Sequence, residues 1–349
     1  MDTAPSISRL QIVTPVYNDW PSFCVLLRAL DAQTRRLGRS LSVLAVDDGS
    51  TERPKFVRET VAALQTIERV EILHLSLNVG HQRALAVGLC HVSDTCDADA
   101  IVIMDSDGED PPAHIARLLE AAEGNAEFCI VASRRKRSER LSFRAGYFVY
   151  KTLFKLVTGT HIDFGNFSFL SPGGVRRLTM LPDLWNNLAA ALLRSRMPIR
   201  KVPLDRGVRY AGRSKMNFSS LIVHGFSTIS VYSDAIFVRL LMTTLAMMGL
   251  TAVGIGFVLF LRLFHPQHAT PGWATTVSAG LIVILLQVLF ATFTSLMMLL
   301  HSRTQRLMLP AHDYKPYIRS LELLRGQAST ARRPDLAETL ERHESWSLA

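Results

Sequence analysis

The sequence predicts an α/β protein, in which a mostly parallel sheet with helices on both faces is followed by interfacial helices and a two-helix transmembrane hairpin. Two observations predict this fold class. Short apolar runs bounded by turn residues alternate with helical patterns up to residue 132, and two long uncharged runs follow at about 240–261 and 274–300. With 349 residues, the chain is long enough for one large domain and a smaller part.

The predicted strands share one property: they are apolar on consecutive residues, as in LSVLAV and AIVIM, rather than alternating with polar ones. This pattern is typical of a parallel sheet that is covered on both faces. The strands are expected at Leu10–Val16, Leu41–Val46, Val70–Leu75, Ala100–Met104 and Phe128–Ala132. Ligands of such sheets bind at the carboxyl ends of the strands, so functional residues are expected directly after them.

Acidic residues follow two of these strands. Asp47 and Asp48 follow the second strand, and the run Asp105, Ser106 and Asp107 follows the fourth. No GxGxxG follows the first strand and no GxxxxGK[ST] occurs, so the glycine-rich routes to phosphate binding lack their residues. Asp105 and Asp107 could instead hold Mg²⁺ or Mn²⁺ and leave positions open for diphosphate oxygens. Taken alone, the same pattern also fits a turn or a helix cap.

The two long uncharged runs are each long enough to cross a bilayer, which takes roughly 20 apolar residues in a helix. Pro266 and Pro271 break the short link between them, so a hairpin is expected rather than buried soluble helices. Basic residues cluster outside this link, at Arg239, Arg303, Arg306, Lys315 and Arg319. Together with the missing signal peptide, the positive-inside rule predicts a protein integral to the cytoplasmic membrane, with its catalytic domain and both termini in the cytoplasm.

These features divide the chain into a cytoplasmic domain at 1–212, an amphipathic region at 213–236, two spans within 237–300 and a cytoplasmic tail at 301–349. The stretch Met216–Tyr232 is apolar on one face, which fits either a helix in the membrane interface or an ordinary core-facing helix. Small residues on the first span, such as Gly249 and Gly254, favour packing within the hairpin, with contact between subunits of a homo-oligomer as the alternative.

A formal charge of +9 and a pI near 9.7 favour an anionic partner. Basic residues gather just after the fifth strand, at Arg134, Arg135, Lys136, Arg137, Arg140 and Arg144. A role in nucleic-acid binding is not expected, because no binding motif accompanies this cluster and two spans fix the chain to a membrane. Anionic lipid headgroups or a phosphorylated substrate fit better. The four cysteines contain no CxxC pair and are expected as buried thiols.

Several motifs occur together in a characteristic order: VTPVYND (13–19), VDDGST (46–51), NVGHQRALAVGL (78–89) and IMDSDGEDPP (103–112). As a set they resemble the family 2 glycosyltransferases. DFGNF (163–167) and RYAGRSKM (209–216) resemble motifs of the polyprenyl-phosphate branch of that family, and two C-terminal spans suit this branch. The resemblance covers about residues 8–300 and implies a GT-A, Rossmann-like domain that uses a nucleotide-sugar donor and a polyprenyl phosphate acceptor.

The resemblance also implies roles for individual residues. Those expected to bind the nucleotide-sugar are Pro15, Tyr17, Asp48, Asn78, Asp105, Ser106, Asp107, Arg209, Ser214 and Lys215, with Asp105 and Asp107 also holding the metal. Arg134 and Arg144 are expected to bind the lipid phosphate. Asp163 and Asp110 are the candidates for positioning or deprotonating the acceptor, Asp163 being preferred. His81 is interpreted as a surface or capping histidine rather than a ligand.

The expected reaction is transfer of the sugar with inversion, giving a polyprenyl-phosphate sugar and a nucleoside diphosphate. The chain departs from the branch at Glu109, where Gln is frequent, and at Ser168, where Arg is frequent, so substrate contacts can differ there. Two alternatives stay open. A processive polysaccharide synthase would carry more spans and a QxxRW segment, and a non-catalytic nucleotide-sugar-binding scaffold would not need its acidic residues.

Overall fold

The computed structural model describes residues 7–52, 55–124, 129–134, 159, 162–211, 227–264, 272–304 and 307–327. These residues fall into two compact units. The sheet unit lies within Met1–Ser138, Ile162–Val231 and Met308–Ala349, and the hairpin unit lies within Glu139–His161 and Tyr232–Leu307.

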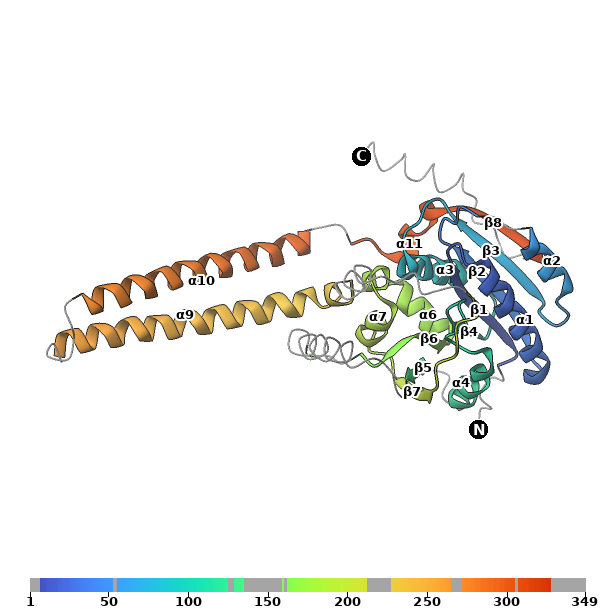
Figure 1. The fold of residues 1–349 in the computed structure, drawn as a ribbon, viewed down its shortest axis with the longest axis horizontal. Coiled ribbons are helices and arrows are strands. Elements are labelled where there is room, and N and C mark those ends of the chain that lie inside the picture. Colours follow the sequence, from blue (N-terminus) through green and yellow to red (C-terminus); the bar gives the residue numbers. More distant parts are fainter. Residues whose placement is uncertain are drawn as a thin grey trace. The chain divides into compact units, whose positions relative to one another are not determined.

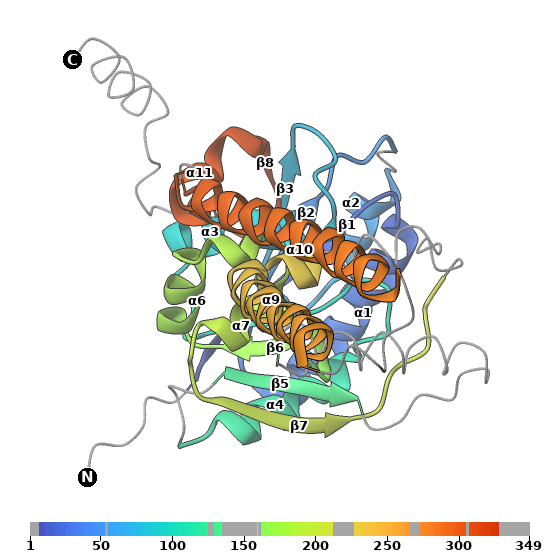
Figure 2. The same ribbon diagram turned by 90° about the vertical axis from the view of Figure 1, so that its left-hand side faces the viewer.

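The sheet unit is built on one eight-stranded sheet in the described part of the chain, with strand order β7-β5-β6-β4-β1-β2-β3-β8 (Figures 1 and 2). The strands are β1 Arg9–Val16, β2 Ser40–Asp47, β3 Arg69–Leu75, β4 Ala100–Ile103, β5 Cys129–Arg134, β6 Phe164–Leu170, β7 Ile199–Leu204 and β8 Ile318–Arg325. Strands β6 and β8 run antiparallel to their neighbours, whereas the other pairs are parallel. The expected mostly parallel sheet is therefore confirmed, and the five predicted strands correspond to β1–β5.

Helices cover both faces of the sheet, as expected for consecutively apolar strands (Figure 1). They are α1 Trp20–Leu37, α2 Phe56–Ala63, α3 His81–Thr95, α4 Ile115–Ala122, α6 Pro172–Thr179 and α7 Leu188–Arg194. One core cluster joins residues of α1, α2 and α4 to one face, and a second joins residues of α3, α6 and α7 to the other. Within β1, neighbouring Ile12 and Val13 belong to opposite clusters and both are fully buried. The expected mostly parallel sheet with helices on both faces is thus confirmed.

Strands β6 and β7 are additions to the predicted sheet. Strand β6 lies between β4 and β5 and pairs antiparallel with both, with Ile103 opposite Ser168. Strand β7 forms one edge of the sheet, and its Pro203 suits an edge position, where a missing N–H costs no ladder hydrogen bond. Its sequence IRKVPL carries two charges and a proline, so it gave no strand pattern.

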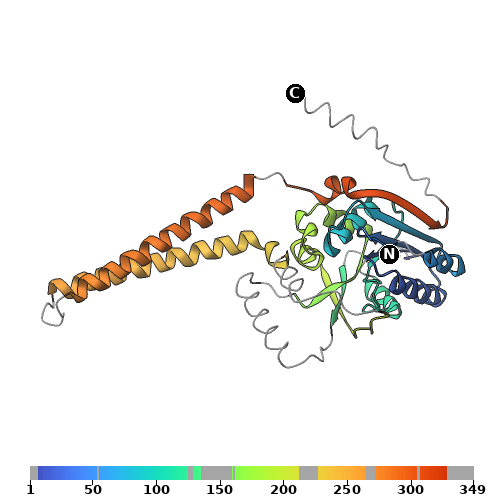
Figure 3. The same cartoon turned by 45° about the horizontal axis from the view of Figure 1, so that its top comes forward.

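The other edge of the sheet comes from the C-terminal segment. Strand β8 pairs antiparallel with β3, next to which it runs in Figure 3. The short elements before it, α11 Pro310–Asp313 and the 3₁₀ turn Lys315–Tyr317, bring Tyr314 into the core, where it is 2% exposed and donates to Asp94 of α3 at 2.7 Å. The sequence predicted only a polar tail from residue 301. Residues 308–325 instead complete the sheet.

A chain of charged side chains fastens β8 to the sheet. His74 of β3 lies between two carboxylates: its Nδ1 is 2.7 Å from Asp47 Oδ2 of β2, and its Nε2 is 3.2 Å from Glu322 Oε2 of β8. Glu322 also pairs with Arg58 of α2 at 2.6 Å. The hydrogen bond with Asp47 and the contact with Glu322 outweigh burial and raise the pKa of His74. Burial opposes ionisation of Asp47 and Glu322, but their hydrogen bonds keep the pKa of each below its usual range.

From these contacts of His74, Asp47 and Glu322 we predict how the stability of the fold depends on pH. A histidine whose folded-state pKa is raised stabilises the fold below its unfolded pKa, near 6.5, and loses that effect as pH rises through the folded value. The lowered carboxylates stabilise above about pH 4 and lose the effect on acidification. We expect the Tm of the protein in detergent to fall by about 2–4 °C between pH 6 and pH 9, the effect of about 1 kcal/mol. Circular dichroism melts of wild type and His74→Gln check this, and an equal fall in both would contradict it.

The hairpin unit consists of α9 Ser233–Phe264 and α10 Trp273–Thr304, two long helices that lie side by side (Figure 1). Among the described residues, Ser233–Phe264 and Thr275–His301 are long and apolar enough to cross a membrane. Only 17% and 11% of their most apolar windows are buried, unlike the core helix of a soluble protein. These proportions are those expected of a transmembrane hairpin.

The two apolar helices pack along a narrow seam. The buried residues of α9 are Thr244, Thr251 and Val258, at intervals of seven, which is the spacing of a two-helix contact. A Cβ on Gly254 would lie 3.4 Å from Leu281 of α10, so Gly254 serves the packing within the hairpin that the sequence favoured. Around Gly249 the same test finds open space.

Most of the predicted amphipathic stretch, 216–226, lies outside the described residues. Its described end packs on the sheet unit: Asn187 donates from its amide to Thr228 Oγ1 at 3.1 Å, and Val231 is 1% exposed. This end therefore follows the core-facing alternative rather than the interfacial one.

Candidate functional site

The candidate site lies at the carboxyl ends of the parallel strands. Strands β1, β2, β3 and β4 run in one direction, so the loops that follow them meet at one edge of the sheet. The antiparallel β6 begins at the same edge, because its Ser168 pairs with Ile103 near the end of β4. The segment after β7 also reaches this edge, through the contacts described below.

The acidic turn, residues 105–110, follows β4 and is held by its own side chains. The carboxylate of Asp110 accepts from the backbone N–H of Asp105 at 3.0 Å, and Asp107 Oδ1 accepts from the N–H of Glu109 at 2.9 Å. Ser106 is 7% exposed and donates from its hydroxyl to the Pro15 carbonyl of β1 at 3.1 Å. These bonds fix the turn in a shape that leaves the second oxygen of Asp107 for other partners. Asp110, expected at the acceptor, is thus part of the turn itself.

The segment after β7, residues 205–211, packs on the acidic turn. Tyr210 donates from its N–H to the Asp107 carbonyl at 2.7 Å, and Gly207 donates to the Glu109 carbonyl at 2.9 Å. Gly108 has φ +95°, and a Cβ there would lie 2.8 Å from the Tyr210 ring, so the turn needs glycine for both conformation and space. This packing explains why a segment about 100 residues downstream belongs to the same site.

Arg209 belongs to this segment and lies next to the acidic turn. Its guanidinium lies 3.1 Å from Asp107 Oδ2 and 3.8 Å from Asp19 Oδ2, and about a quarter of its side chain is exposed. Burial and the neighbouring charge of Asp105 raise the pKa of Asp107, although Arg209 and Arg206 act in the opposite direction. The turn is therefore a place where negative charge is concentrated and an added cation is favoured. The structure thus brings Arg209 to Asp107, which the sequence assigned to the same site. Ser214 and Lys215 lie outside the described residues.

His81 joins the site, although the sequence interpretation excluded it. It begins α3, and its Nε2 lies 3.2 Å from Asp105 Oδ1. Partial desolvation disfavours the charged ring, but Asp105, Asp48 and Asp107 outweigh it and raise the pKa of His81. The sequence did indicate this position for His81, because the NVGHQ segment contains the start of α3, the helix that follows β3 at the carboxyl edge of the sheet.

Asn166 of β6 is the second residue that the sequence missed. Its amide nitrogen lies 2.9 Å from His81 Nε2 and 3.5 Å from Asp105 Oδ1. Gln82 fixes the orientation of this amide, because Gln82 accepts from the N–H of Leu188 at 2.8 Å and donates to Asn166 Oδ1 at 3.1 Å. The NH₂ of Asn166 is thereby directed toward His81 and Asp105.

Asp163, the preferred catalytic residue, occupies a different position from Asn166. It precedes β6 and pairs with Lys201 of β7, at 2.8 and 3.0 Å from its two oxygens, and about a third of its side chain is exposed. Of the DFGNF motif, the structure thus brings Asn166 rather than Asp163 into contact with Asp105. Arg134 ends β5, and Arg144 lies outside the described residues.

The loop after β2 contributes Asp48. The side chain is buried, and its two oxygens accept from the N–H groups of Val79 and Gly80 at 2.7 and 3.1 Å. Asn78 in turn donates from its amide to the Asp48 carbonyl at 3.0 Å. Burial raises the pKa of Asp48 to about 6, although both N–H groups lower it. Asp48 and Asn78 therefore join the loops after β2 and β3.

The two predicted residues of the β1 loop differ in exposure. Pro15 is buried within β1 and takes part through its carbonyl, which Ser106 contacts. Tyr17 follows the strand and is 42% exposed, so its ring is accessible to a ligand. Tyr17 thus suits stacking on a planar group, whereas Pro15 shapes the backbone.

The residues present suit a hard divalent ion. Asp105 and Asp107 supply two carboxylates, with 28% and 14% of their side chains exposed. No group of three or more His, Cys, Asp or Glu side chains that could hold a metal occurs among the described residues. A pair of carboxylates with open positions is the arrangement that Mg²⁺ adopts when substrate phosphates supply its other ligands.

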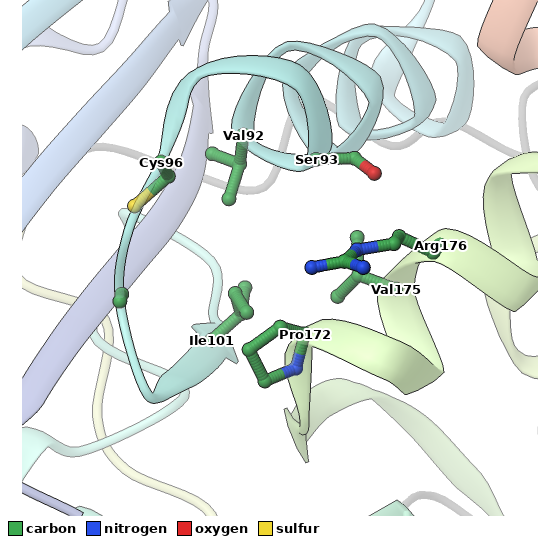
Figure 4. Close-up of a pocket in the computed structure, with 8 residues that line it drawn as sticks. Val92, Ser93, Cys96, Ile101, Pro172, Val175 and Arg176 are labelled. Carbon is green, nitrogen blue, oxygen red and sulfur yellow. The ribbon is translucent and has the colours of Figure 1, made fainter. Parts of the chain in front are cut away.

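Two cavities in the described part of the chain lie outside the candidate site. The one in Figure 4 has a volume of about 10 Å³ between α3 and α6, with Val92, Cys96 and Arg176 in its lining, and holds at most about one water molecule. Another of about 170 Å³ is lined by residues at the amino ends of β1, β2 and β3, such as Gln11 and Glu71. Neither belongs to the candidate site.

Comparison with known proteins finds one matching family and several similar enzymes. Residues 11–175 match the family described as Glycosyl transferase family 2. An undecaprenyl-phosphate 4-deoxy-4-formamido-L-arabinose transferase from Klebsiella pneumoniae is 26% identical over 285 residues, which cover 78% of this chain and 82% of the relative. The enzyme of the same name from Edwardsiella ictaluri is 27% identical over 232 residues, covering 64% and 67%.

Among solved structures, a glucosyl-3-phosphoglycerate synthase from Mycobacterium tuberculosis, in complex with Mn²⁺ and UDP-glucose, aligns with a TM-score of 0.48. It is 14% identical, and the alignment covers 66% of this chain and 79% of that one. The matched residues, 11–175, include most of β1, the strands β2–β6 and the acidic turn, whereas Arg209 lies beyond them. Residues 11–175 therefore carry a Glycosyl transferase family 2 domain, and the curated relatives of the chain are named as undecaprenyl-phosphate sugar transferases.

Proposed function

We propose that this glycosyltransferase moves a sugar from a nucleotide-sugar, UDP- or GDP-linked, to a polyprenyl phosphate. The observation that carries the proposal is the acidic turn with Arg209 at its side, in a chain that also has an apolar hairpin. Such a site suits a donor diphosphate, which needs cations and carboxylate-held metal together. The undecaprenyl phosphate in the relatives' names supports the acceptor.

The donor would lie across the loops after β1, β2 and β4. Tyr17 would stack on the base, and Asp48 would accept from the base or ribose, because a carboxylate oxygen that holds one N–H can accept a second hydrogen bond. With its pKa near 6, Asp48 is mostly ionised at neutral pH. Asn78 and Ser106 would shape the loops around the donor through the bonds they make to Asp48 and Pro15.

Asp105 and Asp107 would hold Mg²⁺ or Mn²⁺. The bound ion would neutralise the charge that develops on the departing diphosphate. Arg209, and Ser214 and Lys215 in the segment after it, would contact the same diphosphate and exclude water when both substrates are bound. Arg209 already lies beside Asp107, so it can move from a carboxylate to a phosphate partner over a short distance.

The acceptor needs little activation. A phosphate monoester is largely dianionic at neutral pH, since its second pKa is near 6. One phosphate oxygen would attack the anomeric carbon in line with the leaving group, so a carbon–oxygen bond forms with inversion. The bond from that carbon to the diphosphate breaks, and the nucleoside diphosphate leaves with the electron pair. The pairing of Asp163 with Lys201 and of Asp110 with the Asp105 N–H is compatible with positioning roles for both carboxylates.

The lipid phosphate would be held by Arg134 and Arg144, because two phosphorylated substrates in one site repel each other unless each has its own cations. The hairpin would anchor the enzyme in the cytoplasmic membrane, with the catalytic domain and both termini in the cytoplasm as the distribution of Lys and Arg indicates. This arrangement would place donor and acceptor on one side of the membrane.

The proposal is tested with the full chain purified in detergent. The protein is incubated with Mn²⁺ and a panel of UDP- and GDP-sugars, with and without undecaprenyl phosphate, and release of nucleoside diphosphate is measured. One donor is expected to give release that requires the lipid phosphate and that EDTA abolishes. Release at the same rate without the lipid would contradict the acceptor, and release unaffected by EDTA would contradict the metal.

Arg209→Ala is expected to lower kcat/KM for the donor by about 10–100-fold, because it removes a charge-assisted contact to the diphosphate. Arg209→Lys should recover only part of this loss, since a lysine cannot make the two-pronged contact. Arg200→Ala, on the exposed face of β7, is the matched control and should retain the wild-type rate. Steady-state kinetics with varied donor measure all three variants, and an unchanged kcat/KM in Arg209→Ala would remove Arg209 from the donor site.

A further inference from the structure

The chain of charged side chains that fastens β8 continues beyond Asp47 into the candidate site. Asp47 is 1% exposed, and its other oxygen, Oδ1, accepts from the backbone N–H of Ser50 at 2.9 Å. Ser50 Oγ accepts from the N–H of Asn18 at 2.9 Å. Asn18 Oδ1 in turn accepts from the N–H groups of Thr51 and Glu52 at 2.9 and 3.2 Å. One continuous path thus leads from a strand at the sheet edge to the loops after β2 and β1.

The path ends at the residues that are proposed to contact the nucleotide. Asn18, which has φ +47°, follows Tyr17 directly. Asp48 follows Asp47 and holds the loop after β3 through Val79 and Gly80. Gly49 adds a steric link, because a Cβ there would lie 2.6 Å from the backbone nitrogen of Asn78. A displacement of Asp47 would therefore move the three loops together.

The His74 ring suits the role of a rigid connector. It is 6% exposed, and it faces Asp47 from β2 and Glu322 from β8, while Arg58 of α2 holds Glu322 from the other side. A ring between two carboxylates donates from both nitrogens, so its orientation is set at both ends. Side chains that orient a ligating residue from behind commonly change affinity when they are altered, although they touch no ligand.

We propose that His74 and Glu322 are positioning residues for the donor, which hold the loop 47–51 in the conformation that binds the nucleotide. The inference rests on the proposed function and deepens it. It also means that the segment after the second apolar helix supplies part of the support of the donor site, because Glu322 belongs to β8. Glu322 is therefore separated in sequence by the whole hairpin from the residues that are proposed to contact the nucleotide.

Substitutions can test the contact of His74 Nδ1 with Asp47 and that of Nε2 with Glu322 separately. The amide nitrogen of Asn can occupy the place of the ring Nδ1, so His74→Asn retains a donor for Asp47 and loses the contact with Glu322. His74→Leu removes both contacts at similar bulk. Glu322→Gln keeps an oxygen near the ring but no charge, and Ser320→Ala, which is exposed on the same strand opposite His74, is the matched control.

The experiment measures binding of UDP and of GDP, each with Mn²⁺, to the full chain in detergent by isothermal titration calorimetry, and thermal unfolding of every variant beside it. For the nucleotide that binds wild type, His74→Leu is expected to raise Kd by roughly tenfold, in the range seen when a supporting hydrogen bond behind a ligand-binding residue is lost. His74→Asn should restore most of the affinity, Glu322→Gln should weaken binding by a smaller factor, and Ser320→Ala should match wild type.

A role in stability alone would lower the Tm of His74→Leu and leave Kd unchanged, and that result would overturn the inference. Equal Kd values for His74→Leu and His74→Asn, both weaker than wild type, would also overturn it, since the contact with Asp47 would then not matter. Failure of wild type to bind either nucleotide would contradict the proposed function itself, and the inference with it. Nucleotide binding by wild type therefore distinguishes a failure of the inference from a failure of the proposed function.

Discussion

Asp107→Asn is expected to reduce sugar transfer by about 10²–10³-fold, the effect of removing one electrostatic contact to a developing charge. The amide has the shape of the carboxylate, and its oxygen can still accept from the N–H of Glu109, so the turn should keep its conformation. What is lost is the negative charge that balances Arg209 and would hold the divalent ion. Steady-state transfer rates, with the Tm of each protein, measure the effect.

The matched control for this prediction is Asp97→Asn. Asp97 lies on the surface of the same unit, with 94% of its side chain exposed, and pairs with Arg9 rather than with residues of the acidic turn. This variant should transfer at the wild-type rate. A non-catalytic scaffold predicts instead that Asp107→Asn and Asp97→Asn behave alike, so equal rates in the two variants would count against a catalytic acidic turn.

Gly207→Ala is expected to lower kcat/KM by about 10²-fold or more, because it separates the segment that carries Arg209 from the acidic turn. A Cβ at Gly207 would lie 2.2 Å from the Gly108 carbonyl oxygen and 2.8 Å from the Pro111 ring, and the backbone atom cannot move without shifting the turn. A misplacement of about 1 Å in a catalytic arrangement can cost a factor of this size. Kinetics with varied donor should show the loss, while the Tm falls only slightly because the segment lies on the surface.

Gly173→Ala provides the comparison for this substitution. Gly173 lies in the first turn of α6, and a Cβ there would meet only Ser171 Oγ at 4.0 Å, an ordinary contact. Alanine should be tolerated, with activity near wild type. Full activity of Gly207→Ala would mean that the segment after β7 does not need its contact with the turn during the reaction.

The sequence predicted those elements whose own residues carry a recognisable pattern. Strands β1–β5 read as consecutive apolar runs because both faces of a parallel sheet are buried, and the two apolar helices show their length directly. Asp105, Asp107 and Arg209 were placed in one site from their motifs, and the structure brings them within hydrogen-bonding or ion-pairing reach of a common turn.

The strand and the site residues that the sequence did not predict are positioned by contacts with segments far away in the sequence. Strand β8 alternates polar and apolar residues only over 320–323, which is too short to predict a strand. It forms because the edge of β3 and the charges of His74 and Arg58 are available to it. His81 and Asn166 look like ordinary polar residues until α3 and β6 bring them to Asp105. Conversely, the motif containing Asp163 gave no hint that Lys201 of β7 would pair with it.

We propose that transfer of a sugar to a polyprenyl phosphate by this glycosyltransferase depends on its acidic turn. The most direct test incubates wild type and Asp105→Asn in detergent with undecaprenyl phosphate, Mn²⁺ and the radiolabelled nucleotide-sugar identified by the panel, and then counts label in the organic phase. Label is expected with wild type, and it should fall to background in Asp105→Asn and with EDTA. Label that stays in the aqueous phase with wild type, or equal organic-phase label with Asp105→Asn, would contradict the claim.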